Sequence, residues 1–363
     1  MDTVLPPEPS SFAPSTPQSA LAYRDRSTGL QAYGVIQIIL GALVSLFIPL
    51  VLLAALMSRN LTGTAMPIGN YFTSCLTYAA FAVLLITLGV GSLRARRWAR
   101  ALTLILSWFT LVIGFLATVL MTAVLPTAFA AAVRTAAARN PGNANLPTGV
   151  TAVVLTVMIV LFAVFLVVIP LAFVLFYGRA DVEQTCRHRD PVDRWTDRCP
   201  LPVLAASLLF AVAAFYYLLQ SFTTPLVPFF GKYLTGVPGA AACLVLAAID
   251  ALLALWFFRV QILGWRIGVL WVALRTISTA VTDRRGNLLQ AYQGLGWKQA
   301  QIDLIARNPM LRGHVILWWN LVYLLVGLGY LIWIKRYFPA PASYGGEPAI
   351  PQPVSSPDPG QSV

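Results

Sequence analysis

The chain has 363 residues, of which 58% are hydrophobic and only 10% are charged. Ordinary soluble domains carry about 25% charged residues, which cover their surfaces. Thirteen acids and 25 bases are too few to cover a soluble fold of this length. The composition therefore excludes a soluble globular protein and predicts an integral membrane protein.

The net charge of +12 does not indicate a nucleic acid as partner. A nucleic-acid-binding protein gathers its basic residues on one soluble face, whereas here they lie in short segments between apolar blocks. We therefore expect the lipid bilayer to be the main partner and expect no nucleic acid to bind. The sequence leaves protein partners and the oligomeric state open.

Eight apolar blocks predict eight transmembrane helices and an all-α fold. About 20 residues are needed to cross the hydrocarbon core, and lipid offers the backbone no hydrogen-bond partner outside a helix. The seventh block is the least apolar, because Arg266 and Arg275 interrupt it. Pro49 and Pro170 lie inside predicted spans and should kink them. The predicted spans are residues 31–57, 71–93, 100–124, 150–177, 201–221, 239–258, 264–282 and 314–334.

Segments rich in Pro and Ser enclose the eight blocks. Residues 1–28 and 339–363 have too little apolar content to order their backbone, so we predict two disordered cytoplasmic tails. The chain between them divides into a first four-helix half (29–178), a cytoplasmic linker loop (179–199) and a second four-helix half (200–338).

The distribution of Lys and Arg predicts the orientation. With a cytoplasmic N-terminus, 15 of the 25 basic residues fall on the cytoplasmic side, as the positive-inside rule requires. Many of the others lie in or beside the long loop 283–313, where charges count less. Both termini are therefore predicted to be cytoplasmic. Only three of the basic residues are Lys, and Ala, Gly and Pro are abundant, which favours a bacterial cytoplasmic membrane.

The two halves have similar spacing, which predicts an internal repeat. A displacement of 166 residues places the first three spans on the fifth, sixth and seventh, and Arg100 on Arg266. The fourth and eighth spans match only with a small difference in length. Because each half holds an even number of spans, the halves would have the same orientation, as in parallel repeats.

The sequence contains no motif that predicts an enzyme or a cofactor site. Phosphate-binding, zinc-protease, nucleophile-elbow and dinucleotide signatures are all absent, and the chain has only two histidines, His188 and His314. Cys186, His188 and Cys199 offer three zinc ligands, but a closed structural site needs four. We expect no metal there, but a well-ordered loop that links the two halves.

Asp250 is the only acid within a predicted span. An ionisable group near the centre of a bilayer costs several kcal/mol unless it is paired or hydrated. Asp250 lies nine residues before Arg259, and Arg275 lies nine residues after Arg266. At about 1.5 Å per residue, both charges lie at the same depth on adjacent antiparallel helices. We predict an intramembrane ion pair between Asp250 and Arg275, which either fixes the register of the helices or belongs to a transport site.

Other polar residues in the spans have simpler interpretations. We expect Gln37, Gln220 and Asn320 to form hydrogen bonds to neighbouring helices, and Gly264 and Gly268 to form a close-packing face. The favoured function is a non-enzymatic membrane component, such as a scaffold or accessory subunit. The alternatives are a secondary transporter for a small solute that uses Asp250 and Arg275, and an intramembrane enzyme.

Overall fold

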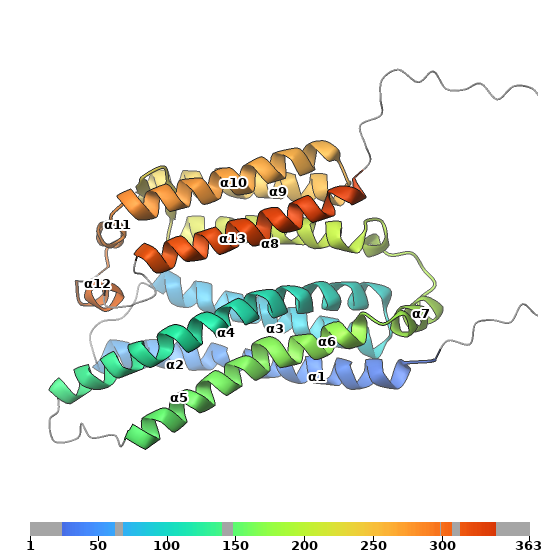
Figure 1. Ribbon diagram of the computed structural model, residues 1–363, viewed down its shortest axis with the longest axis horizontal. Helices are drawn as coiled ribbons and strands as arrows, with labels where there is room; N and C mark the ends of the chain where they lie inside the picture. Colours follow the sequence, from blue (N-terminus) through green and yellow to red (C-terminus); the bar gives the residue numbers. More distant parts are fainter. Residues whose placement is uncertain (1–23, 62–67, 140–147, 298, 307–312, 339–363) are drawn as a thin grey trace, which may run out of the picture.

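The computed structural model is a bundle of long helices (Figure 1). Most of the two predicted tails lies outside the described residues. Helix α1 nevertheless begins inside the range assigned to the first tail, at Ser27. The structure describes residues 24–61, 68–139, 148–297, 299–306 and 313–338.

The first half is built from helices only, over its described residues. Two interruptions occur at prolines. Helix α1 ends at Ser45, the residue whose carbonyl would clash with the ring of Pro49. A π-helix precedes Pro170, which has no N–H for the carbonyl of Leu166. The elements are α1 (Ser27–Ser45), α2 (Phe47–Leu61), α3 (Ile68–Leu93), α4 (Arg97–Arg139), α5 (Thr148–Ala163), η2 (Val164–Val168) and α6 (Ile169–Tyr177).

Helix α4 is much longer than the span predicted at 100–124. It has 43 residues and contains Pro126. At about 1.5 Å per residue it exceeds the 30 Å hydrocarbon core by a factor of about two. Its apolar part, Arg97–Pro126, meets the length and composition of a membrane span. The apolar block predicts only the part of the helix that lies in lipid, and α4 continues beyond that part.

The predicted linker loop is ordered and contains a helix. It holds α7 (Ala180–Arg189) and the 3₁₀ turn η3 (Trp195–Asp197). Acidic residues occupy the first turn of α7 and basic residues its last turn, which is the favourable arrangement for the helix dipole.

The second half contains a β-hairpin in addition to its helices, so the prediction of an all-α fold missed one small element. Strand β1 pairs antiparallel with β2, from Leu226 opposite Thr235 to Phe229 opposite Lys232. Phe230 and Gly231 both have positive φ, as expected for the two-residue turns that fit a twisted hairpin. The elements are α8 (Leu201–Thr223), β1 (Leu226–Phe229), β2 (Lys232–Thr235), α9 (Gly236–Phe258), α10 (Ile262–Arg285), α11 (Leu288–Gly294), α12 (Gln299–Ala306), α13 (Gly313–Ile334) and η5 (Lys335–Tyr337).

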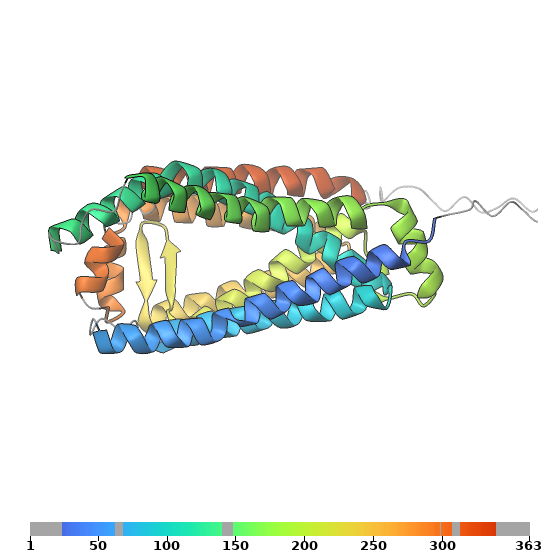
Figure 2. The same cartoon turned by 90° about the horizontal axis from the view of Figure 1, so that it is seen from below.

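The helices form two layers, which are best seen in Figure 2. One layer contains α1, α2, α3, α8 and α9, and the other contains α4, α5, α6, α10 and α13. The layers approach each other at the end where α7 lies and where α1 begins and α13 ends; we call this the α7 end. They diverge toward the opposite end, the hairpin end, where β1 and β2 lie between them (Figure 2).

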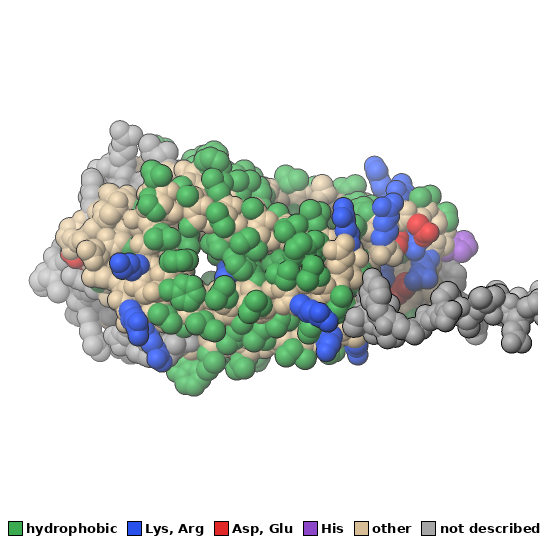
Figure 3. All heavy atoms as spheres, turned by 90° about the horizontal axis from the view of Figure 1, so that it is seen from above, with side chains coloured by type: hydrophobic (Ala, Val, Ile, Leu, Met, Phe, Trp, Pro, Cys, Tyr) green, Lys and Arg blue, Asp and Glu red, His purple; other side chains and the backbone are tan. Residues whose placement is uncertain are grey.

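The buried core lies mainly toward the α7 end, where Leu204, Leu253, Phe257 and Ile334 are fully buried in one cluster. Many large apolar side chains instead face outward. An apolar band covers the middle of the face in Figure 3, with Lys and Arg toward its ends. Within the described residues, seven helices are long and apolar enough to cross a membrane. Helix α10, the predicted seventh span, is not one of them, although it packs along α13. The protein is therefore a helical membrane protein.

Candidate functional site

Asp250 lies on α9 and is completely buried. Nη1 of Arg275 donates to Oδ2 of Asp250 at 3.2 Å. The indole Nε1 of Trp271 donates to the other carboxylate oxygen, Oδ1, at 2.8 Å. The structure thus brings the two predicted residues into contact, and a tryptophan that the sequence did not single out completes the site.

Tyr217 on α8 adds a third partner. Nη2 of Arg275 donates to the Tyr217 hydroxyl, and the guanidinium carbon lies 4.8 Å from the centre of the same ring, within the range of a cation–π contact. The side chain of Arg275 is 29% exposed, in contrast to that of Asp250. Tyr217, Asp250, Trp271 and Arg275 form what we call the Asp250 cluster, which ties together α8, α9 and α10.

The local sequence explains why these side chains meet. Trp271 and Arg275 are four residues apart on α10, so they project from the same face of the helix. Glycines allow α9 and α10 to approach closely near their connecting turn. A Cβ atom at Gly264 would lie 2.5 Å from the Cβ of Trp256, and one at Gly268 would lie 2.8 Å from the ring of Phe257. These are the two glycines of the predicted close-packing face.

The other intramembrane polar residues differ in what they bind. Nε2 of Gln37 on α1 donates to the Thr103 hydroxyl on α4 at 3.1 Å, so this amide does join neighbouring helices. Gln220 instead donates to the carbonyl oxygen of Leu226 in the hairpin, at 3.0 Å.

Asn320 on α13 binds a carboxylate at the hairpin end. Its Nδ2 donates to Oδ2 of Asp283 at 2.8 Å. The hydroxyl of Tyr233 donates to the other oxygen of Asp283 at 2.7 Å. Asp283 thereby connects the end of α10 with α13 and strand β2.

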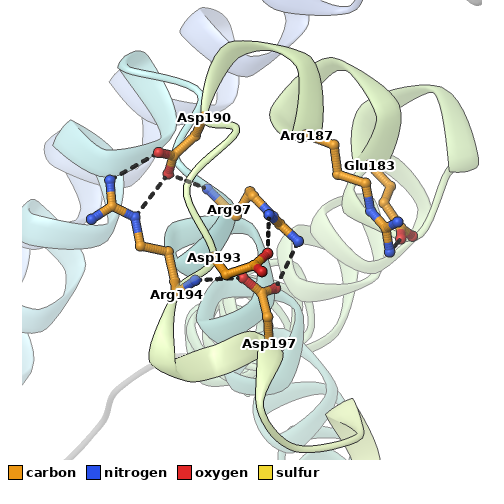
Figure 4. Close-up of polar contacts among 7 residues, drawn as sticks. All are labelled: Arg97, Glu183, Arg187, Asp190, Asp193, Arg194 and Asp197. Carbon is orange, nitrogen blue, oxygen red and sulfur yellow. Dashed lines mark hydrogen bonds and ion pairs between the residues drawn. The ribbon is translucent and has the colours of Figure 1, made fainter.

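A second polar cluster, at the α7 end, was not predicted. Its centre is Asp190, whose side chain is 2% exposed. Arg194 donates to Asp190 at 2.8 Å, and the backbone N–H of Arg97 donates at 3.3 Å (Figure 4). Arg96 also donates to Asp190, at 3.1 Å. The hydrogen bond from Arg194, with that from the Arg97 backbone, holds the pKa of Asp190 below its ordinary value despite burial.

Further ion pairs extend from Asp190 along the start of α4. Arg97 pairs with Asp193 at 3.0 Å and with Asp197 at 3.4 Å (Figure 4). Arg100 pairs with Glu183 at 3.1 Å and donates to the carbonyl oxygen of Tyr177 at 3.1 Å. The linker is thus anchored to α4 by charge.

The start of α1 is also held by the linker. Arg26 pairs with Asp181 at 3.4 Å, and Arg189 with Asp25 at 3.2 Å. Five of the 13 acids of the chain lie between residues 181 and 197. This local density of acids, next to a loop rich in Arg, is the sequence signal that could have predicted the cluster.

The three possible zinc ligands of the linker do not come together. Cys186 is buried beside Leu30 and Tyr177, whereas Cys199 is buried in the cluster around Phe257. Burial raises the pKa of both thiols to about 11. In the part of the chain that the structure describes, no group of three His, Cys, Asp or Glu side chains could hold a metal ion.

In the Asp250 cluster, the negative charge of the Asp250 carboxylate is compensated by Arg275. Each carboxylate oxygen of Asp250 accepts one hydrogen bond, and Arg275 divides its donors between a carboxylate and a hydroxyl. The geometry of the site has to indicate the function, because the chain matches no protein family and shows no significant similarity to a curated protein or a solved structure.

Proposed function

We propose that this protein is a non-enzymatic membrane component, a scaffold or accessory subunit, in which the Asp250 cluster holds the two layers together. One observation carries the proposal: both oxygens of the buried Asp250 carboxylate already accept hydrogen bonds, from Trp271 and Arg275. Such full pairing is what a structural charge requires. A carboxylate that carries protons or substrate needs an oxygen that faces the transport path.

The proposal includes eight membrane spans. Both described ends of the chain lie at the α7 end (Figure 1), so the chain must run along the bundle an even number of times. Seven helices are apolar enough to span the membrane, so an even number of spans requires one more. We assign this eighth span to α10, which packs along α13. Arg275 lowers the apolarity of α10, but its pairing with Asp250 reduces the cost of placing it in lipid.

We place the α7 end in the cytoplasm of a bacterial cell. The helix ends and turns at this end carry most of the Lys and Arg residues, as the positive-inside rule requires. Single cysteines at Arg336 and Lys232, in a chain whose four native cysteines are replaced by Ala, test this orientation. A membrane-impermeant maleimide should label position 232 but not 336 in intact cells. Labelling of both positions, or of 336 alone, would exclude the orientation.

Two similar turns support a parallel repeat. One joins α3 to α4 in the first half, and the other joins α9 to α10 in the second half. Ala95 N–H donates to Ser92 O at 2.9 Å, and Val260 N–H donates to Phe257 O at 2.9 Å. Each turn also has the longer bond of the same C-cap motif, from Arg96 to Gly91 and from Gln261 to Trp256. All these residues correspond at an offset of 165. At this turn Arg100 therefore corresponds to Trp265, one residue before the predicted Arg266.

The functional test separates folding from activity. Cells without the chromosomal gene would receive either the wild-type chain or D250L/R275M, in which both charges are replaced by apolar side chains and the longer arginine by the unbranched methionine. If the cluster is structural, the double variant should reach a folded level close to that of wild type and should restore the deletion phenotype to the same extent. A folded double variant that fails to restore the phenotype would contradict the structural role.

The second candidate function is transport of a small solute. It is favoured by the 29% exposure of Arg275 and by a hollow near the middle of the face shown in Figure 3. A partly exposed guanidinium could attract an anionic group of the solute. This candidate predicts the opposite outcome of the same experiment, in which the double variant folds but has no activity.

A further inference from the structure

Four exposed basic side chains gather at the α7 end of the second half. Arg259 lies in the turn between α9 and α10, Arg266 in the first turns of α10, and Lys335 and Arg336 in η5. The Phe257 and Phe338 ring centres are 5.6 Å apart, so η5 lies beside this turn. We call Arg259, Arg266, Lys335 and Arg336 the basic rim.

The basic rim has no acidic partner among the described residues. The described acids of the second half are Asp250, which is buried against Arg275, and Asp283 and Asp303, which lie in the segments at the hairpin end. The first half differs, because its Arg residues at the start of α4 are neutralised by the acids of the linker. Arg96, Arg97 and Arg100 are therefore paired with carboxylates, whereas the four residues of the basic rim have no such partner in the part of the chain that the structure describes.

Two of the four rim residues, Lys335 and Arg336, contact aromatic rings. Lys335 Nζ lies 5.2 Å from the centre of the Trp265 ring, and the indole N–H of Trp265 donates to Leu331 O at 2.7 Å. The guanidinium of Arg336 lies 4.4 Å from the Trp333 ring. Trp and Tyr concentrate where the hydrocarbon meets the headgroups. We therefore expect Lys335 and Arg336 to lie near the depth of the lipid phosphates.

We propose that the basic rim binds the phosphate groups of anionic phospholipids. The rim combines four positive charges that have no acidic partner among the described residues with ring contacts that position two of them, Lys335 and Arg336. Each basic residue near a membrane surface attracts anionic lipid, and guanidinium groups can bind phosphate oxygens in pairs. At the matching end of the first half, Arg96, Arg97 and Arg100 are held in ion pairs with the linker. Within the described chain, the exposed Arg24, Arg94, Arg179 and Arg198 lack the ring contacts of Lys335 and Arg336. The preferred lipids would thus associate with one side of the bundle.

The test uses the purified full-length protein in a non-ionic detergent. Phosphatidylglycerol, phosphatidylcholine and soluble glycerol phosphate are titrated separately, and binding is measured by native mass spectrometry. Phosphatidylglycerol should bind at least tenfold more tightly than either of the others. Equal affinity for phosphatidylcholine would overturn the proposal. So would tighter binding of a poly-glutamate peptide, because the surface would then fit an acidic protein segment rather than a lipid.

Matched variants locate the site. The rim variant R259Q/R266Q/K335Q/R336Q should lose at least tenfold in affinity for phosphatidylglycerol. The control variant R24Q/R94Q/R179Q/R198Q removes the same charge from four exposed basic residues at the same end and should stay within threefold of wild type. Similar losses in both variants would overturn the proposal, since net charge alone would then explain binding.

Two further variants protect the test against misfolding. R259K/R266K/R336K keeps every charge but loses the paired guanidinium donors, so its affinity for phosphatidylglycerol should lie between those of the wild type and of the fourfold Gln variant. If the fourfold variant does not fold, R259Q/R336Q takes its place in the test. This variant keeps Lys335 above Trp265 and should lose part of the affinity for phosphatidylglycerol. Unchanged affinity in folded R259Q/R336Q would count against the rim.

Discussion

Ala95 and Val260 adopt the same left-handed backbone conformation, with φ of 50° and 53°, at corresponding places in the two tight turns of the bundle. An L-residue in this conformation costs about 1–2 kcal/mol, and a β-branched residue such as Val is especially rare there. The two halves thus contain the same unfavourable turn, with a side chain where glycine would be expected. The recurrence of this geometry within one chain supports the proposed repeat.

Replacement of Val260 tests the strain in this turn. Val260→Gly should be more stable than Val260→Ala by about 1 kcal/mol, because both variants lose the packing of valine but only glycine adopts positive φ without strain. Thermal unfolding of both variants in one detergent measures the difference. Val269, inside α10, is the control. There glycine should be less stable than alanine by about 1 kcal/mol. The same order of stability at both positions would show that the turn is not strained.

The crossing of α4 with the π-helix should depend on Gly114. A Cβ atom at this position would lie 2.2 Å from the carbonyl oxygen of Leu166, and a backbone oxygen cannot move aside as a side chain can. We expect Gly114→Ala to destabilise the protein by about 1–3 kcal/mol. Gly329→Ala on α13 is the control, because its Cβ would meet nothing within 4 Å. That control should be neutral or slightly stabilising; equal melting of the two variants would disprove the close crossing.

The linker should make the protein sensitive to acid. The pKa of Asp190 is lowered in the folded protein, chiefly by the hydrogen bond from Arg194. Its contribution to stability is therefore present above the unfolded pKa of about 3.9 and is lost as the pH falls through the lower, folded pKa. Asp190→Asn should cost about 1–3 kcal/mol at neutral pH and should weaken the pH dependence below about pH 4.

Asp193 provides the control for the linker. It also pairs with an arginine, but its side chain is 90% exposed, so solvent screens the interaction. At each pH between 3 and 7, Asp193→Asn should unfold at nearly the same temperature as the wild type. If the two variants have the same pH profile, the burial of Asp190 is not what stabilises the linker.

The sequence predicted those features that lipid imposes directly. Apolar blocks of sufficient length located the long helices, and the constant rise of a helix placed Asp250 and Arg275 at one depth. Their contact is present because a short turn joins α9 to α10 and forces them to run antiparallel. The interruption beside Pro49 followed from the missing N–H and the ring of proline.

The remaining features depend on contacts between distant segments. Tyr217 reaches Arg275 only because α8 packs on α9, and nothing in its own neighbourhood predicts this. Trp271 could have been found, since it precedes Arg275 by one helical turn. The β-hairpin depends on a two-residue turn, Phe230-Gly231, that lacks the usual Asn-Gly or Asp-Gly signal. The pairing of Asp190 with Arg96 needs the linker to fold back onto α4.

The Asp250–Arg275 pair carries the central claim, and a double-mutant cycle tests it most directly. Removing one partner leaves an uncompensated charge in a low-dielectric interior, so Asp250→Asn and Arg275→Leu should each cost about 3–5 kcal/mol. The double variant should be clearly more stable than the sum of the two losses predicts. A control cycle pairs Asp250→Asn with Arg266→Leu, an exposed residue on the same helix as Arg275, and should be additive within about 0.5 kcal/mol. Two single variants that melt like wild type, or equal coupling in both cycles, would contradict the structural role of the pair.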